Sequence, residues 1–180
     1  MTGATTGAPN EETPTTHRVY LGLGSNIPDR DAHLAAALQA LAPLVMVERV
    51  SSVYDTAPML VTDQPRFHNL ALAATTDLSP HELLRGVKAI ERGLGRADGP
   101  RYGPRVIDID LLFYDQLVLQ TDELTIPHPR VTERAFVLAP LAEIAPTLTH
   151  PALGETVAEM LGRVAGSDVR RMGPLPHSER

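Results

Sequence analysis

The segment from residue 103 to residue 115, GPRVIDIDLLFYD, constrains the fold more than any other part of the chain. Its nearly unbroken apolar run predicts a buried β-strand, yet it contains two carboxylates, Asp108 and Asp110. Side chains alternate between the faces of a strand, so the two aspartates share one face. Val106, Leu112 and Tyr114 are predicted on that same face, and Ile107, Ile109, Leu111 and Phe113 on the buried face. This strand therefore predicts a sheet with helices on one face and a second face that is partly open.

Strand and helix patterns alternate along the rest of the chain. Apolar residues at strand spacing predict strands at 18–26, 44–56 and 66–76. A first helix is predicted at 29–43, and a second starts at Ser79, where Ser79-Pro80-His81-Glu82 forms a capping box with proline at the first helical position. With the strand at 103–115, the order is β-α-β-β-α-β, which is typical of a ferredoxin-like α+β sandwich.

Additional elements are predicted after this core. The strand at 103–115 is predicted to turn at Asp115-Gln116 into a short partner at 117–120, which forms an added hairpin. A helix capped by Thr132 and a short helix around 154–161 are predicted near the C-terminus.

Length and composition indicate one domain at 17–165. Residues 1–16 are rich in Thr, Gly, Ala and Pro without an apolar period, so they are predicted to be a disordered tail, and 166–180 a polar C-terminal end. Cysteine is absent, which excludes disulfides and thiolate metal sites. No apolar run approaches the roughly 20 residues that span a bilayer, and the N-terminal residues lack the charged segment followed by an apolar segment that is typical of a signal peptide. We therefore expect a cytoplasmic protein, favour a monomer, and expect no membrane or nucleic-acid partner, the latter because the formal charge is −6.

The aspartate pair needs compensating positive charge. The two Cα atoms are expected to lie roughly 6–7 Å apart, where unit charges repel by about 2.5 kcal/mol at an effective dielectric constant of 20. An isolated D-x-D is more often paired with arginines, here Arg101 or Arg105. Alternatively the pair binds Mg²⁺, which prefers few carboxylates together with water and phosphate oxygens. The second alternative is favoured by the cationic and histidine side chains on both sides of the strand, namely Arg96, Arg101, Arg105, His128, Arg130 and Arg134.

A second group of residues suits a flat ring. Phe67 and Asn69 share one face of their predicted strand, and Phe136 follows the predicted cap Thr132 by four residues. Taken singly, core packing or an edge hydrogen bond is the commoner role for such residues. Together they would suit a planar heterocycle between two rings with an amide at its edge. Gly22 and Gly24 lack the third glycine of a dinucleotide motif and instead predict close approach of neighbouring groups.

Several segments together resemble the 6-hydroxymethyl-7,8-dihydropterin pyrophosphokinase family. They are YLGLGSN, SSVYDTAPM, DQPRFHNLAL, LSPHELL, IERGLGR, GPRVIDIDLLFYD, LTIPHPR and ERAFVLAPLAEIAP, in the family's order from about residue 18 to 160. The resemblance implies transfer of pyrophosphate from ATP to the hydroxymethyl group of the reduced pterin, which gives AMP and the pterin diphosphate in folate biosynthesis. ATP and the reduced pterin would be the ligands, with two Mg²⁺ ions as cofactor.

The resemblance also implies roles for individual residues. Asp108 and Asp110 match the metal ligands, and with Arg96 and Arg105 they form the implied catalytic group. The implied pterin-binding residues are Thr56, Ala57, Met59, Phe67, Asn69 and Phe136. The implied ATP-binding residues are Glu91, Arg96, Arg105, Leu111, Thr125, His128 and Arg134.

The chain departs from the family pattern at three places. Leu60 stands where the family commonly has glycine, Asp98 replaces the second arginine of a frequent G-R-x-R, and Tyr102 replaces a common tryptophan. Two other functions stay open at this point. One is a different Mg²⁺-dependent nucleotidyl or phosphoryl transferase, and the other is a non-catalytic small-molecule-binding ferredoxin-like domain in which the aspartates pair with arginines.

Overall fold

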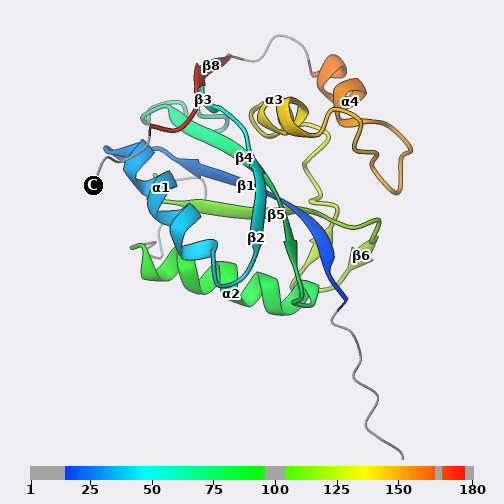
Figure 1. The fold of residues 1–180 in the computed structure, drawn as a ribbon. Helices are drawn as coiled ribbons and strands as arrows, with labels where there is room; N and C mark the ends of the chain where they lie inside the picture. The colour runs from blue at the N-terminus through cyan, green and yellow to red at the C-terminus, as the bar shows by residue number, and fades with distance from the viewer. Residues whose placement is uncertain (1–14, 96–103, 165–167, 177–180) are drawn as a thin grey trace, which may run out of the picture.

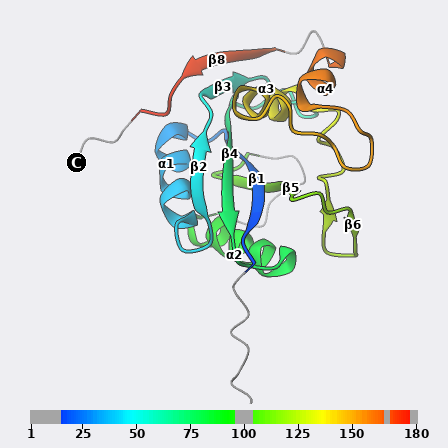
Figure 2. The same cartoon turned by 45° about the vertical axis from the view of Figure 1, so that its right-hand side comes forward.

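The computed structural model describes residues 15–95, 104–164 and 168–176 of the chain. Figures 1 and 2 show an α+β fold in which one large antiparallel sheet carries helices on both faces. The elements in chain order are β1 (His17–Ser25), α1 (Arg30–Leu41), β2 (Met46–Val50), β3 (Val53–Thr56), β4 (Phe67–Thr76), α2 (Pro80–Gly93), β5 (Asp108–Tyr114), β6 (Leu119–Gln120), β7 (Thr125–Ile126), α3 (Ala135–Ile144), α4 (Val157–Arg163) and β8 (Val169–Gly173).

The sheet confirms the predicted ferredoxin-like order. Its strands run β5-β1-β4-β3-β8, and β2 also pairs with β4. Helix α1 connects β1 to β2, and α2 connects β4 to β5. The single strand predicted at 44–56 is wrong in detail, because it is divided into β2 and β3 at two buried serines. The backbone and the hydroxyl of Ser51 bond to Ala71 there, so the break stays attached to β4.

Two apolar cores lie on opposite faces of the sheet. The first lies under α1 and α2 and includes Leu21, Leu34 and Leu83. The second lies under α3 and α4 and includes Leu138 and Met160. Figures 1 and 2 show α1 and α2 together on one face, with α3 and α4 over part of the other. The part of the second face that α3 leaves uncovered carries the aspartates.

A β-bulge in β5 changes the predicted facing of two residues. Tyr20 of β1 pairs with Phe113, but the next residue, Leu21, pairs with Leu111, so β5 contains one extra residue. Beyond the bulge, each side chain of β5 lies on the opposite face of the sheet from the one that strict alternation predicts. Phe113 therefore lies in the core under α3 and α4, edge-on to Tyr20, and Tyr114 lies in the core under α1 and α2. The predicted faces of Phe113 and Tyr114 are wrong for this reason, while those of Asp108 and Asp110 are unaffected.

Two other predictions, which concern the segment after β5, are wrong. The chain does turn at Asp115, which has a φ of 44°, but the hairpin that follows joins β6 to β7 and does not extend β5. Helix α3 begins after Arg134 without a side-chain cap, so Thr132 is not its cap. The capping box of α2, with Pro80 at the start of the helix, is confirmed.

The strand β8 was not predicted, and it anchors α3. It pairs with β3 and brings Arg171 to Glu143 of α3. Glu143 also accepts hydrogen bonds from Ser52 and from the Tyr54 hydroxyl. Burial raises the pKa of Glu143, but the hydrogen bonds from these partners outweigh it and lower the pKa overall. This carboxylate therefore holds α3, which carries Phe136, against the sheet.

Candidate functional site

A cavity of about 600 Å³ opens on the sheet face beside α3. It is lined by residues of β1, β3, β4, β5, α2 and α3 and of the loops that precede β4, β5 and α3. It brings together most of the residues singled out from the sequence, namely Thr56, Ala57, Met59, Phe67, Asn69, Arg105, Asp108, Asp110, His128, Arg134 and Phe136. Residues more than 80 positions apart in the chain therefore meet in one cavity, which sequence patterns alone could not establish.

Some predicted residues lie elsewhere. Glu91 is 1% exposed and does not line the cavity, and its Oε1 accepts the backbone N–H of Ile109 at 2.7 Å. Glu91, in α2, thus holds the backbone of β5 at Ile109, which lies between the two aspartates. Leu111 lies in the core under α1 and α2, and Thr125 lies in β7. Arg96, Asp98, Arg101 and Tyr102 lie outside the described residues.

The strand register explains why the aspartates are open to the cavity. Asp108 lies opposite Gly24 of β1, and Asp110 lies opposite Gly22. Both glycines line the cavity, and neither places a side chain beside the carboxylates. Gly24 also lies opposite Asn69 of β4, so Asp108, Gly24 and Asn69 form one row across the sheet. The glycines therefore form a flat floor between the carboxylates and the amide.

Gly24 permits the close approach that the sequence predicted. A Cβ atom at this position would lie 2.4 Å from Oδ1 of Asn69, closer than real Cβ contacts allow. Asn69 is 6% exposed, and its Nδ2 donates to Oγ1 of Thr56 at 2.7 Å. Asn69 is thus held rigidly over Gly24 and has little room to move away.

Changing Gly24 to alanine is expected to displace the Asn69 amide and to weaken, by roughly tenfold or more, the pterin binding that the sequence resemblance implies, because a held hydrogen-bonding group is worth about 1–2 kcal/mol. Gly22→Ala is the matched control, since a Cβ there would meet only Leu112 at 3.4 Å. Calorimetric titration of both variants with a pterin analogue measures the difference. Equal affinities in the two variants would contradict the role of Gly24.

Cationic side chains surround His128 at one side of the cavity. Burial has the largest effect and, with the nearby positive charges, lowers the pKa of His128 to about 4. The charges belong to Arg134, Arg130 and Lys88. Nδ1 of His128 accepts the backbone N–H of Arg130 at 3.1 Å, so the neutral ring carries its proton on Nε2. His128 is therefore a neutral donor within a positively charged region that suits phosphate oxygens.

Stability is expected to fall on acidification because of His128. Its folded-state pKa of about 4 lies below the value of about 6.5 for an unfolded chain. The unfolded state binds more protons between these two values, so stability is lost as pH falls from about 6.5 to about 4, by on the order of 1–3 kcal/mol. His128→Asn, whose Oδ1 can accept the same N–H, should flatten this slope. Denaturant unfolding at several pH values measures it, and part of the slope should remain because burial also lowers the pKa of His150. An unchanged slope in the variant would contradict the assignment.

Three polar or charged cavity residues received no role from the sequence. Lys88, Gln64 and Glu133 line it together with the residues predicted above. Lys88 lies three residues before Glu91 on α2, and its Nζ bonds to Oε2 of Glu91 at 3.0 Å. That spacing on one face of a helix was a usable signal. Gln64 and Glu133 lie in loops, where no periodicity indicates their direction.

Two aromatic side chains belong to the cavity, and one of them, Phe67, lies beside the glycine floor, because a Cβ at Gly24 would lie 3.8 Å from its Cδ1. Phe67 and Phe136 both line the cavity. The guanidinium carbon of Arg134 lies 5.5 Å from the centre of the Phe136 ring, a cation–π contact. Arg134 therefore connects the aromatic and the cationic parts of the cavity.

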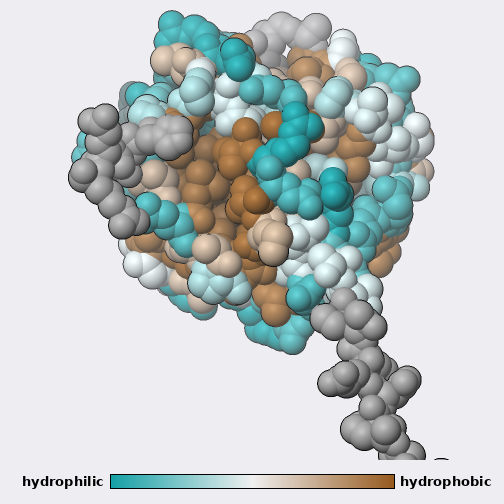
Figure 3. All heavy atoms as spheres, viewed as in Figure 1, coloured by the Kyte–Doolittle hydropathy of each residue, from teal (hydrophilic) through white to brown (hydrophobic). Residues whose placement is uncertain are grey.

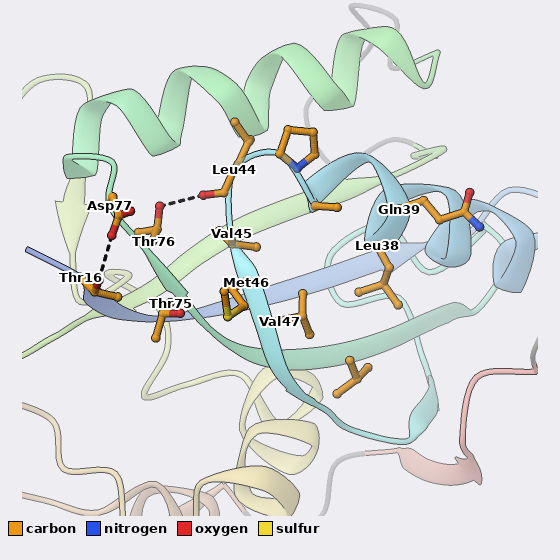
Figure 4. A pocket seen from close by; sticks show the side chains of 13 residues that line it. Thr16, Leu38, Gln39, Leu44, Val45, Met46, Val47, Thr75, Thr76 and Asp77 are labelled. Atoms are coloured by element: carbon orange, nitrogen blue, oxygen red, sulfur yellow. Dashed lines mark hydrogen bonds between the residues drawn. The ribbon is translucent and has the colours of Figure 1, made fainter. Parts of the chain in front are cut away.

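A larger hollow of about 750 Å³ lies between α1 and β2, away from these groups. Figure 3 shows apolar surface gathered there, and Figure 4 shows the residues that line it, among them Leu38, Met46 and Val47. Among the described residues that line it, Asp77 is the one charged side chain, and Thr16 donates to it at 2.9 Å. This hollow lacks the charged groups that phosphate chemistry requires, despite its size.

Comparison with known proteins identifies the family. Residues 20–146 match the family described as 7,8-dihydro-6-hydroxymethylpterin-pyrophosphokinase (HPPK). The chain belongs to the HPPK family. It is 49% identical over 157 residues to the 2-amino-4-hydroxy-6-hydroxymethyldihydropteridine pyrophosphokinase of Methylorubrum extorquens, with 86% of this chain and 98% of that protein covered. The cavity residues from Gly22 to Val137 all fall within the HPPK match.

Other HPPK relatives are much longer proteins. The chain is 50% identical over 131 residues to the mitochondrial folate synthesis bifunctional protein of Arabidopsis thaliana, covering 72% of this chain and 24% of that protein. The chain thus spans about a quarter of the length of such relatives. A crystal structure of Plasmodium falciparum HPPK-DHPS with pteroate is similar in fold, with a TM-score of 0.68 and 17% sequence identity, covering 84% of this chain and 44% of that chain.

The carboxylates of this HPPK chain fit Mg²⁺ better than a metal held by protein groups alone. Within 15–95, 104–164 and 168–176, no group of three or more acidic or histidine side chains is placed to hold a metal ion. A pair of carboxylates beside a group of cationic side chains suits Mg²⁺, which takes its other ligands from water and phosphate. Use of ATP by the HPPK family is consistent with this ion. In the same part of the chain, no helix has the length and apolar character needed to cross a membrane.

Proposed function

We propose that the chain transfers the pyrophosphoryl group of ATP to the hydroxymethyl group of 6-hydroxymethyl-7,8-dihydropterin, giving AMP and the pterin diphosphate, in folate biosynthesis. One observation carries this proposal. The cavity that holds Asp108 and Asp110 also holds the cationic region at His128 and the ring-binding group of Phe67, Asn69 and Phe136. Side chains suited to a triphosphate and side chains suited to a planar heterocycle therefore share one cavity, which supports the proposal.

The sheet sets the separation of these two parts. Asp108 and Asn69 lie two strands apart, with Gly24 between them, and neighbouring strands are about 4.8 Å apart, so the two residues are separated by roughly 10 Å. A bicyclic ring whose one-carbon arm carries the hydroxyl can bridge such a distance. With its edge at Asn69, its hydroxyl would point toward the carboxylates.

In the proposed reaction, the pterin hydroxyl oxygen forms a bond to the β-phosphorus of ATP, and the bond from that phosphorus to the oxygen shared with the α-phosphorus breaks. AMP leaves with the electron pair, and the hydroxyl proton passes to solvent. Asp108 and Asp110 would hold two Mg²⁺ ions, which neutralise phosphate charge when bound. The protein's own part is to position the two substrates and to exclude water.

Phosphate binding is proposed for Arg105, His128 and Arg134, joined by Lys88 and Arg130. Arg96 keeps its proposed catalytic and ATP-binding role. For Glu91 we propose an indirect part in ATP binding, through its bond to Lys88. Leu111 and Thr125 are proposed to border the adenine.

Pterin binding is proposed for the residues at the other end of the cavity. Phe67 and Phe136 would stack on the two faces of the ring, and Asn69 would bond to its edge. The backbone of Thr56, Ala57 and Met59 would bond to the remaining edge. Because one chain supplies all these groups, we propose a monomer, and we place it in the cytoplasm.

Product analysis tests the function. Purified protein incubated with Mg²⁺, ATP and the reduced hydroxymethylpterin is expected to release AMP, and omission of any of the three should abolish release. Mass spectrometry of the pterin product should show the added diphosphate. Formation of ADP would overturn the proposal, because it would indicate transfer of a single phosphoryl group.

A further inference from the structure

Arg66 is the centre of an ion-pair network beside the cavity. It directly precedes Phe67, the first residue of β4. Its Nε bonds to Oδ1 of Asp55 in β3 at 2.6 Å, and its Nη1 and Nη2 bond to the two carboxylate oxygens of Asp168 at 2.5 and 3.1 Å. Its backbone oxygen accepts a hydrogen bond from Nη1 of Arg30 in α1 at 2.7 Å. Arg66 is thus attached to β3, to α1 and to the residue before β8.

The network lies at the last residue pair between β3 and β4. In this pair Thr56 lies opposite Phe67, and residues 57–66 then leave the sheet as a loop. Arg66 directly precedes Phe67, and its partner Asp55 directly precedes Thr56. The last pair of two strands has a paired neighbour on one side only, so it opens more readily than pairs inside the sheet. The ion pair between Arg66 and Asp55 opposes this opening.

Strand β8 holds the same pair from the other side of β3. Val169 of β8 lies opposite Thr56, and the backbone N–H of Ala57 donates to the backbone oxygen of Asp168 at 3.2 Å. Figures 1 and 2 show β8 beside β3. Of the β8 residues that the structure describes, none lines the cavity, and β8 lies outside the HPPK match. Any effect of β8 on a ligand in the cavity therefore passes through β3 and Arg66.

We propose that Arg66 is a positioning residue for the pterin site, and that Asp168 and β8 act on this site through it. This inference rests on the proposed function, in which Phe67 stacks on the pterin and the backbone of Thr56 and Ala57 bonds to its edge. With the guanidinium held in place, these groups keep their arrangement before the pterin binds. Such preorganisation raises affinity, because less conformational freedom is lost on binding.

The exposure of the network separates positioning from a role in stability. The Arg66 side chain is 37% exposed, and the Asp168 side chain is 65% exposed. Exposed ion pairs contribute little to the free energy of unfolding, because water and salt screen them. Removal of the pair should therefore leave the thermal unfolding temperature nearly unchanged. A purely structural role predicts instead a lower unfolding temperature and weaker binding of both substrates.

Calorimetry measures two affinities in each variant. A nonhydrolysable ATP analogue with Mg²⁺ is titrated by itself, and the reduced hydroxymethylpterin is titrated into protein saturated with that analogue. Arg66→Ala and Asp168→Ala should each weaken pterin binding by roughly fivefold, which corresponds to a competent population of about one fifth. The affinity for the ATP analogue should change by less than about twofold, because the network lies away from the aspartates and His128.

Three further variants sharpen the test. Asp168→Glu keeps the carboxylate and should restore most of the pterin affinity. The double variant of Arg66→Ala with Asp168→Ala should bind the pterin no more weakly than Arg66→Ala, because both changes remove the same contact. Arg163→Ala is the matched control, since it removes an exposed arginine that pairs with Glu155 and does not line the cavity. It should change neither affinity.

Several outcomes would overturn the positioning role. Unchanged pterin affinity in Arg66→Ala would do so, as would equal weakening of both ligands with a lower unfolding temperature. Losses that add in the double variant would show that Asp168 does not act through Arg66. If Arg66→Ala does not fold, unchanged pterin affinity in Asp168→Ala decides against the proposal by itself.

AMP formation by the unaltered protein is assayed in parallel. AMP release together with unchanged pterin affinity in the variants rejects the role of Arg66 alone. Absence of AMP release rejects the proposed function and the inference with it.

Discussion

Replacement of Asp110 by alanine is expected to lower turnover by about a thousandfold or more while the fold persists. Asp110 lies on the open face of β5, opposite Gly22, and it is half-buried, so its removal costs little packing. Removal of one of two proposed metal ligands should forfeit about 4 kcal/mol of transition-state stabilisation, which corresponds to about a thousandfold in rate. The rate of AMP release and the thermal unfolding temperature measure the two effects.

Asp122→Ala is the matched control for this experiment. Asp122 is an exposed carboxylate between β6 and β7 that does not line the cavity. This variant should keep both activity and stability. Two results would count against the metal role of Asp110. One is retained turnover in Asp110→Ala, and the other is its unfolding, which would indicate that the carboxylate stabilises the structure through ion pairs with arginines.

Replacement of Phe136 by alanine is expected to weaken pterin binding by roughly 30-fold, with less than about a threefold change for ATP. The ring lines the cavity and lies next to the guanidinium of Arg134, so it presents a face for stacking. Loss of its contact with a bound ring should cost about 2 kcal/mol. Calorimetric titration with each ligand separately measures both affinities.

Leu148→Ala separates stacking from packing in this prediction. Leu148 is half-buried and packs against the same core as Phe136, but it does not line the cavity. It should lower stability without selective loss of pterin affinity. If Phe136→Ala weakens the pterin and ATP equally, Phe136 supports the cavity as a whole and does not stack on the pterin.

Local patterns in the sequence were enough to predict the order of most elements. The capping box from Ser79 to Glu82 depends on atoms within four residues of one another, and it forms as expected. The shared face of Asp108 and Asp110 depends only on the two-residue period of a strand. Gly24 was expected to mark a close approach, and the space around it confirms this. The family resemblance, carried by motifs such as IDIDLL and IPHPR, is confirmed by the match over residues 20–146.

Features that depend on contacts between distant segments could not be predicted from local sequence patterns. The bulge in β5 arises from its pairing with β1. No residue near Phe113 in the sequence therefore indicates that its side chain lies on the opposite face of the sheet from the one predicted. Strand β8 is polar and largely exposed, and it forms a strand because it pairs with the edge of β3. The lowered pKa of His128 requires burial and cations contributed by α2 and by the segment before α3.

By itself, the sequence determined the type and order of the main elements, the pairing of two carboxylates on one strand face, and the family. These depend on periodicity, on capping and on recognisable motifs, each of which is contained in a short stretch of chain. Only the tertiary structure decided that Asn26 forms hydrogen bonds with Gln64 and Arg105. It also decided that Lys88 lines the cavity and that Glu91 lies beneath it. Such arrangements follow from strand register and from the convergence of loops, and both are set by contacts between residues far apart in the chain.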